Sequence, residues 1–132
     1  MIKKKEILRS GYKIFKEKRL IIEAFSGLLT LENYKSHRLA VSLDVDFSSE
    51  YNLLVDIRSV VVTGLIHDVK AYVNYVIESG YTNGKRNTAI LVATPNQNVY
   101  ARELALLEGM LQNVTIFTDI DNAVKFVTKD FT

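Results

Sequence analysis

The stretch Tyr51–Leu65, "YNLLVDIRSVVVTGL", decides how this chain folds. Its centre is apolar without alternation, which is typical of a strand covered on both faces of a sheet. The apolar run ends at two charged residues, Asp56 and Arg58, and a helical pattern begins after Thr63 and Gly64. The stretch therefore predicts a buried strand followed by a helix, with charged groups near the end of the strand.

On both sides of this stretch, strand patterns alternate with helix patterns. Strands are predicted in "YKIFKE", "LIIEAFSG", "TAILVA" and "VTIFT", and helices over 31–43, over 65–79, from Pro95 to about Met110, and after Asp119. This order is typical of one α/β layer. We predict a mixed, mostly parallel five-stranded sheet with an N-terminal antiparallel hairpin and about four helices.

Bulk composition narrows the class of protein. The 132 residues are enough for one domain, and 48% are hydrophobic, which is ordinary for a globular chain. The chain has no cysteine, which excludes disulfides, thiol catalysis and thiolate metal sites. No apolar run approaches the roughly 20 residues that a membrane-spanning helix needs. We therefore expect a cytoplasmic protein.

Charge is unevenly distributed along the chain. Residues 1–19 carry a net charge of +6, whereas residues 20–132 carry −4. We divide the chain into a basic N-terminal extension over 1–11 and one domain over 12–130. Lys3, Lys4 and Lys5 could contact an anionic membrane surface. The alternative is a solvated extension, and the segment lacks the interleaved aromatics that nucleic-acid stacking requires.

The segments "YKIFKE", "LIIEAFSGLLTLENY", "DFSSEYNLLVDIR" and "AILVATPNQ" resemble the SpoIIAA-like proteins of the STAS-like superfamily. The resemblance covers roughly residues 12–130 and implies their α/β fold. The better understood relatives are antagonists of anti-sigma factors, with a phosphorylatable serine in a segment similar to D-S-S-G-L. Gly64 and Leu65 match that segment, and Thr63 stands at the acceptor position, but the acidic residue and both serines are missing.

The predicted strand ends bring three groups of polar residues to one edge of the sheet. Asp56 and Arg58 end the strand of the opening stretch, Thr63 and Gly64 open the next helix, and Thr94 and Asn96 open the one after. Helix N-termini and an arginine fork could together bind a phosphate or carboxylate. The alternative is that Asp56 and Arg58 pair with neighbours and that Thr63, Thr94 and Asn96 only cap helices.

Other polar residues give weaker signals. His67 lies in the first turn of a predicted helix, where it could carry a proton near the same edge. The loop "DVDFSSE" alternates acidic residues but lacks the glycine of a calcium loop. We predict no metal, no cofactor and no enzymatic activity.

Our first hypothesis is a regulatory or binding module that engages a protein or a small anionic ligand around residues 58–67 and 94–98. Alternatives are an apolar-ligand or membrane-surface protein, and a phosphoswitch at Thr63.

Overall fold

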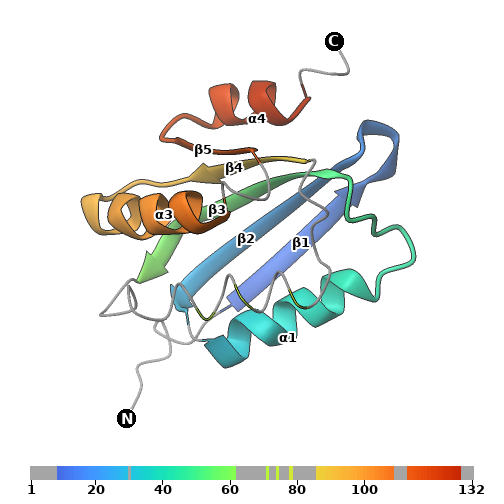
Figure 1. The fold of residues 1–132 in the computed structure, drawn as a ribbon, viewed down its shortest axis with the longest axis horizontal. Helices are drawn as coiled ribbons and strands as arrows, with labels where there is room; N and C mark the ends of the chain where they lie inside the picture. Colours follow the sequence, from blue (N-terminus) through green and yellow to red (C-terminus); the bar gives the residue numbers. More distant parts are fainter. Residues whose placement is uncertain are drawn as a thin grey trace.

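The computed structural model describes residues 9–29, 31–61, 71, 74, 78, 86–108 and 113–128. Labels follow Figure 1. The elements are β1 (Arg9–Phe15), β2 (Leu20–Leu28), α1 (Leu31–Ser42), β3 (Asn52–Val61), β4 (Asn87–Leu91), α3 (Pro95–Glu108), β5 (Asn113–Phe117) and α4 (Ile120–Thr128). Of the helix predicted over 65–79, only residues 71, 74 and 78 are described, and all three are helical.

The five strands form one sheet in the order β1-β2-β3-β4-β5. β1 pairs antiparallel with β2, and the other neighbours pair in parallel. The predicted mixed sheet and its N-terminal hairpin are therefore confirmed. β1 begins at Arg9, which pairs with Ser26, so residues 9–11 of the predicted extension belong to the sheet.

A tight turn joins the two strands of the hairpin. Residues 16–18 form one turn of 3₁₀-helix, and Arg19 has a φ of 51°. This left-handed conformation is unusual for a residue with a Cβ. It lets the Arg19 N–H donate to the Lys16 carbonyl at 3.2 Å, while the Arg19 carbonyl accepts from Asn52 at 2.9 Å. The turn thus also fixes the start of β3.

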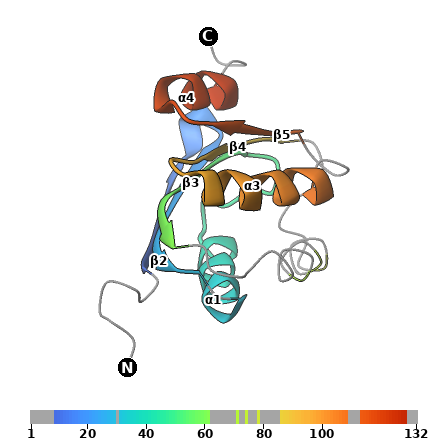
Figure 2. The same ribbon diagram turned by 90° about the vertical axis from the view of Figure 1, so that its left-hand side faces the viewer.

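The sheet is covered by helices on both faces, as the continuous apolar strands predict. Val41 of α1 and Tyr100 of α3 pack on one face, in a core cluster with Ile21, Leu53 and Ile57. We call this the α1/α3 face; Figure 2 shows both helices on this side of the sheet.

On the opposite face, which we call the α4 face, Ala123 and Val127 of α4 pack against Leu54 and Leu91.

One buried asparagine connects α4 to the sheet. The Asn52 side chain donates to the Val127 carbonyl at 2.8 Å and accepts from the Asn87 backbone N–H at 2.9 Å. A buried amide is stable when its donors and acceptors are paired. This residue therefore holds together the start of β3, the start of β4 and the end of α4.

Within the described residues, no helix is long and apolar enough to cross a membrane.

Candidate functional site

The N-terminus of α3 is closed by a reciprocal pair of hydrogen bonds. The Gln97 backbone N–H donates to the Thr94 hydroxyl at 3.2 Å, and the Gln97 side-chain oxygen accepts from the Thr94 N–H at 3.2 Å. The same oxygen accepts from the Ala93 N–H at 2.7 Å. This arrangement is a capping box, which satisfies backbone donors that a helix start leaves free.

The other end of the Gln97 amide reaches the last residues of β3. Its nitrogen donates to the Arg58 carbonyl at 2.9 Å and to the Val60 carbonyl at 3.0 Å. Gln97 is buried, so these bonds are shielded from water. One side chain therefore holds the start of α3 against the end of β3. We call this junction, residues 58–61 and 93–99, the rim.

Asp56 and Arg58 form an ion pair on their own strand. The Arg58 guanidinium donates through Nε to one oxygen of Asp56 at 3.0 Å and through Nη2 to the other at 2.9 Å. The Arg58 backbone N–H adds a third bond at 3.0 Å. Burial alone would raise the pKa of Asp56, but the hydrogen bonds and charge of Arg58 lower this pKa below its ordinary value. The carboxylate in turn raises the pKa of Arg58.

The Asp56 side chain lies on the α4 face. Its parallel partners are Ala24 and Leu91, and Leu91 belongs to the cluster that α4 covers. A shift of register between Ala24 and Ser26 then interrupts the alternation of β3, leaving Arg58 and Ser59 both exposed. Such a bulge commonly redirects side chains next to a binding surface.

The structure thus brings together part of the predicted site. The backbone of Arg58 adjoins the start of α3, where Thr94 is the helix cap and Asn96 is exposed. The Asp56 carboxylate points to the opposite face from α3. Thr63, Gly64 and His67 lie outside the described residues, as do Lys3, Lys4 and Lys5. A common ligand site for these residues stays a prediction.

Two exposed valines lie at the rim. Val61 ends β3 and is 42% exposed, and Val99 of α3 is 44% exposed. Val61 follows Val60, whose carbonyl accepts from Gln97, and Val99 lies two residues after Gln97 in the sequence. The rim therefore offers exposed apolar side chains and the exposed Asn96 at a junction that Gln97 holds, whereas the Arg58 guanidinium turns away to Asp56.

A second polar cluster lies between the sheet and α1. Glu23 of β2 is fully buried, and its carboxylate accepts hydrogen bonds from the Arg38 guanidinium. His37 Nε2 lies 3.1 Å from the same carboxylate. The His37 ring also packs on Phe25, with centroids 4.5 Å apart. These residues were not predicted as functional; the only signal in the sequence is the acidic Glu23 inside the apolar run "LIIEAF".

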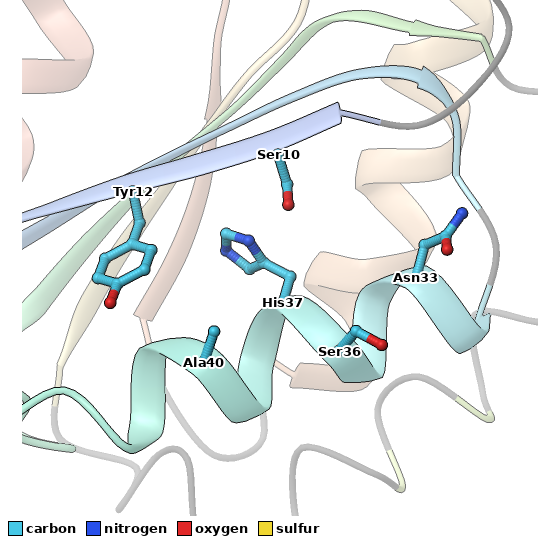
Figure 3. Close-up of a pocket in the computed structure, with 6 residues that line it drawn as sticks. All are labelled: Ser10, Tyr12, Asn33, Ser36, His37 and Ala40. Carbon is cyan, nitrogen blue, oxygen red and sulfur yellow. The ribbon is translucent and has the colours of Figure 1, made fainter.

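A cavity of about 280 Å³ opens beside this cluster, between β1 and α1. Figure 3 shows Ser10 and Tyr12 on its strand side and His37 reaching toward them from the helix. The Tyr12 hydroxyl donates to Asp44 at 2.9 Å. This bond raises the pKa of Tyr12. The pKa of Asp44 is lowered, mainly by the hydrogen bond from the Asp46 backbone N–H and also by the bond from Tyr12.

The acidic loop that superficially matches a calcium motif is used within the protein. Asp44 accepts from the Tyr12 hydroxyl and from the Asp46 N–H, and Asp46 lies 3.8 Å from the Lys16 ammonium. In the part of the chain that the structure describes, no three acidic or histidine side chains gather as metal ligands would.

Comparison with solved structures identifies the class of fold. An uncharacterized protein of the DUF3478 family from Shewanella loihica PV-4, described as having a SpoIIAA-like fold, superposes with a TM-score of 0.63 at 18% identity. The match covers 96% of this chain and 98% of that one. An anti-sigma factor antagonist from Mycobacterium paratuberculosis matches with a TM-score of 0.60 at 13% identity, over 92% and 95% of the two chains.

No family model and no curated protein matches the sequence. The two structural matches show that this chain has a SpoIIAA-like fold, which confirms the fold that the sequence resemblance implied.

Proposed function

We propose that this protein is a non-catalytic regulatory module that binds a partner protein through the rim. The observation that carries the proposal is the Gln97 contact, which fixes the end of β3 and the start of α3 as one rigid surface. A preorganised surface loses little conformational entropy when it binds. The likeness of the fold to that of an anti-sigma factor antagonist agrees with this role.

The chemistry of the rim favours a protein over a small anion. Two donor groups of Arg58 are already bound to Asp56, and the Thr94 hydroxyl already accepts from Gln97. Val61 and Val99 instead offer exposed apolar area. Protein interfaces typically have an apolar centre surrounded by polar residues.

Affinity capture tests the proposal. The tagged full chain is incubated with lysate of its source organism, and bound proteins are quantified by mass spectrometry. The rim variant carries Val61→Asp and Val99→Asp; the matched control carries Ile120→Asp and Val124→Asp, which place the same charges on exposed positions of α4. Circular dichroism verifies that both variants are folded.

We expect at least one protein that the wild type and the α4 control enrich and that the rim variant loses by about tenfold or more, equivalent to about 1.4 kcal/mol. The proposal is wrong if nothing is enriched by the wild type, or if the rim variant retains every bound protein as well as the control does.

A phosphoswitch at Thr63 and membrane contact through residues 3–5 stay predictions, because these residues lie outside the described part of the chain.

A further inference from the structure

β1 is the outer strand of the sheet that the structure describes. It pairs with β2 along Arg9–Phe15 on one side only among the described strands. An outer strand presents backbone N–H and C=O groups with which another extended chain can pair. Several domains bind peptides in this way, with backbone pairing for affinity and side-chain pockets for specificity.

The cavity between β1 and α1 supplies such a pocket (Figure 3). Its lining comes from alternate residues of the strand and from positions three and four apart on the helix: Ser10, Tyr12, Asn33, Ser36, His37 and Ala40. A side chain of an added strand would therefore enter it from beside β1. Its volume of about 280 Å³ leaves room for a side chain of the added strand.

The contact of His37 with the buried Glu23 carboxylate determines which ring nitrogen of His37 can accept a hydrogen bond. The His37 side chain is 2% exposed, and its Nε2 faces the Glu23 carboxylate. Because a carboxylate bound by arginine accepts hydrogen bonds, Nε2 carries the proton in the neutral ring and Nδ1 has a free lone pair. Among the described residues, Nδ1 has no hydrogen-bond partner. His37 lines the cavity, so its Nδ1 can accept a hydrogen bond from a bound side chain.

The strand itself is basic. Arg9 and Lys13 are exposed, and no acidic residue occurs in Arg9–Phe15. A lysine on an outer strand can also serve only to prevent aggregation. That role would not explain why a pocket lies beside the strand. A second copy of this chain is a poor occupant, because antiparallel pairing of two β1 strands brings their cationic side chains together. An acidic segment complements this charge.

We propose that the groove between β1 and α1 binds an extended acidic segment of a partner protein as an added strand, with a serine or threonine side chain donating to His37 Nδ1. The residues that line this groove are not residues of the rim, so their variants test this proposal independently of the function proposed above.

A peptide array tests the proposal with the full-length protein. The probes are nine-residue peptides, blocked at both ends, in which glutamate alternates with valine and the central valine is replaced in turn by each other amino acid. We expect saturable binding by fluorescence anisotropy, with the serine and threonine peptides binding about tenfold more tightly than the valine and alanine ones. N-methylation of alternate backbone nitrogens is expected to abolish binding.

Protein variants locate the binding. Ala40 is an exposed residue of the cavity wall, so Ala40→Phe fills the cavity without disturbing the buried Glu23 cluster. It should weaken binding of the threonine peptide by about tenfold or more. Leu39→Phe is the control, because Leu39 is exposed on the same helix but does not line the cavity.

His37→Gln should remove the preference for threonine over valine. The proposal is overturned if no peptide of the array binds, if N-methylated peptides bind equally well, or if Ala40→Phe and Leu39→Phe bind alike. Dimerisation through β1, detected by analytical ultracentrifugation and abolished by Lys13→Glu, would also overturn it.

Discussion

Glu23 is a charged residue that is fully buried in the sheet. It lies within the apolar run over residues 20–25 of β2, and its carboxylate is bound by Arg38 and His37. A buried ion pair contributes little net stability compared with an apolar core, but removing one partner leaves the other charge uncompensated. The cluster therefore makes the attachment of α1 to the sheet sensitive to single substitutions.

We expect Glu23→Gln to lower the free energy of unfolding by about 3 kcal/mol, because the buried Arg38 guanidinium then loses its ion pair with the Glu23 carboxylate. Urea denaturation followed by circular dichroism measures the change. Glu17→Gln, at an exposed position, should stay within about 0.5 kcal/mol of the wild type. Equal stability of the two variants would show that Glu23 is not held as described.

The Asp56–Arg58 pair predicts a dependence of stability on pH. Because the pKa of Asp56 is lowered in the folded protein, its stabilising contribution is present above the ordinary pKa of an aspartate and is lost as pH falls through the lowered value. Asp56→Asn should therefore be less stable than the wild type at pH 7, by less than about 1 kcal/mol since Arg58 is 41% exposed.

Urea denaturation at pH 7 and at successively lower pH measures this difference. Arg58→Gln should show the same loss at pH 7 and the same convergence with the wild type in acid. A difference between wild type and Asp56→Asn that stays constant over the whole pH range contradicts the assignment.

At the scale of elements, Gln97 decides how α3 meets β3. Its side chain caps the helix with its oxygen and binds two strand carbonyls with its nitrogen. Both roles need the amide, because a carboxylate cannot donate and an aliphatic side chain can do neither. The rim is therefore rigid because of one residue that belongs to a helix but binds a strand.

Gln97→Ala should lower the free energy of unfolding by about 2–4 kcal/mol, because the buried Val60 carbonyl, the part-buried Arg58 carbonyl and the capped backbone N–H groups lose their partner. Hydrogen exchange should also speed up at Ala93 and Thr94. Asn96→Ala, in the same turn but exposed, is the control and should change stability by less than about 0.5 kcal/mol. Unchanged hydrogen exchange at Ala93 and Thr94 in Gln97→Ala would mean that the Gln97 side chain does not make these hydrogen bonds.

The elements were predictable because their patterns are local. The apolar run of β3 and the periodic helices can be recognised from neighbouring residues alone, and α1 differs from its predicted range by one residue. The sequence Thr94-Pro95-Asn96-Gln97 also matches a capping box. Its contact with β3 was not predictable, because that contact depends on how the helix lies on the sheet.

The same limit applies to side-chain direction. A bulge in β3 after Asp56 changes the direction of the side chains that follow it, and a bulge depends on the pairing of two distant segments. Likewise, α1 has only a weak apolar stripe, so nothing local showed that His37 and Arg38 face Glu23.

At the scale of the whole molecule, the described surfaces separate by position. The rim lies at the carboxyl end of β3, and the groove beside β1 lies between the outer strand and α1. α4 covers the opposite face over β3 and β4. The two surfaces are formed by different residues, so substitutions at each can be used to measure binding at the two surfaces separately.

Hydrogen exchange of the full chain, alone and with the protein that it captures from lysate, tests the central claim most directly. The account predicts slowed exchange at residues 57–61 and 93–99 in the complex, with α4 unchanged. Slowed exchange confined to α4 and β5, with the rim exchanging as fast as in the free protein, would contradict it.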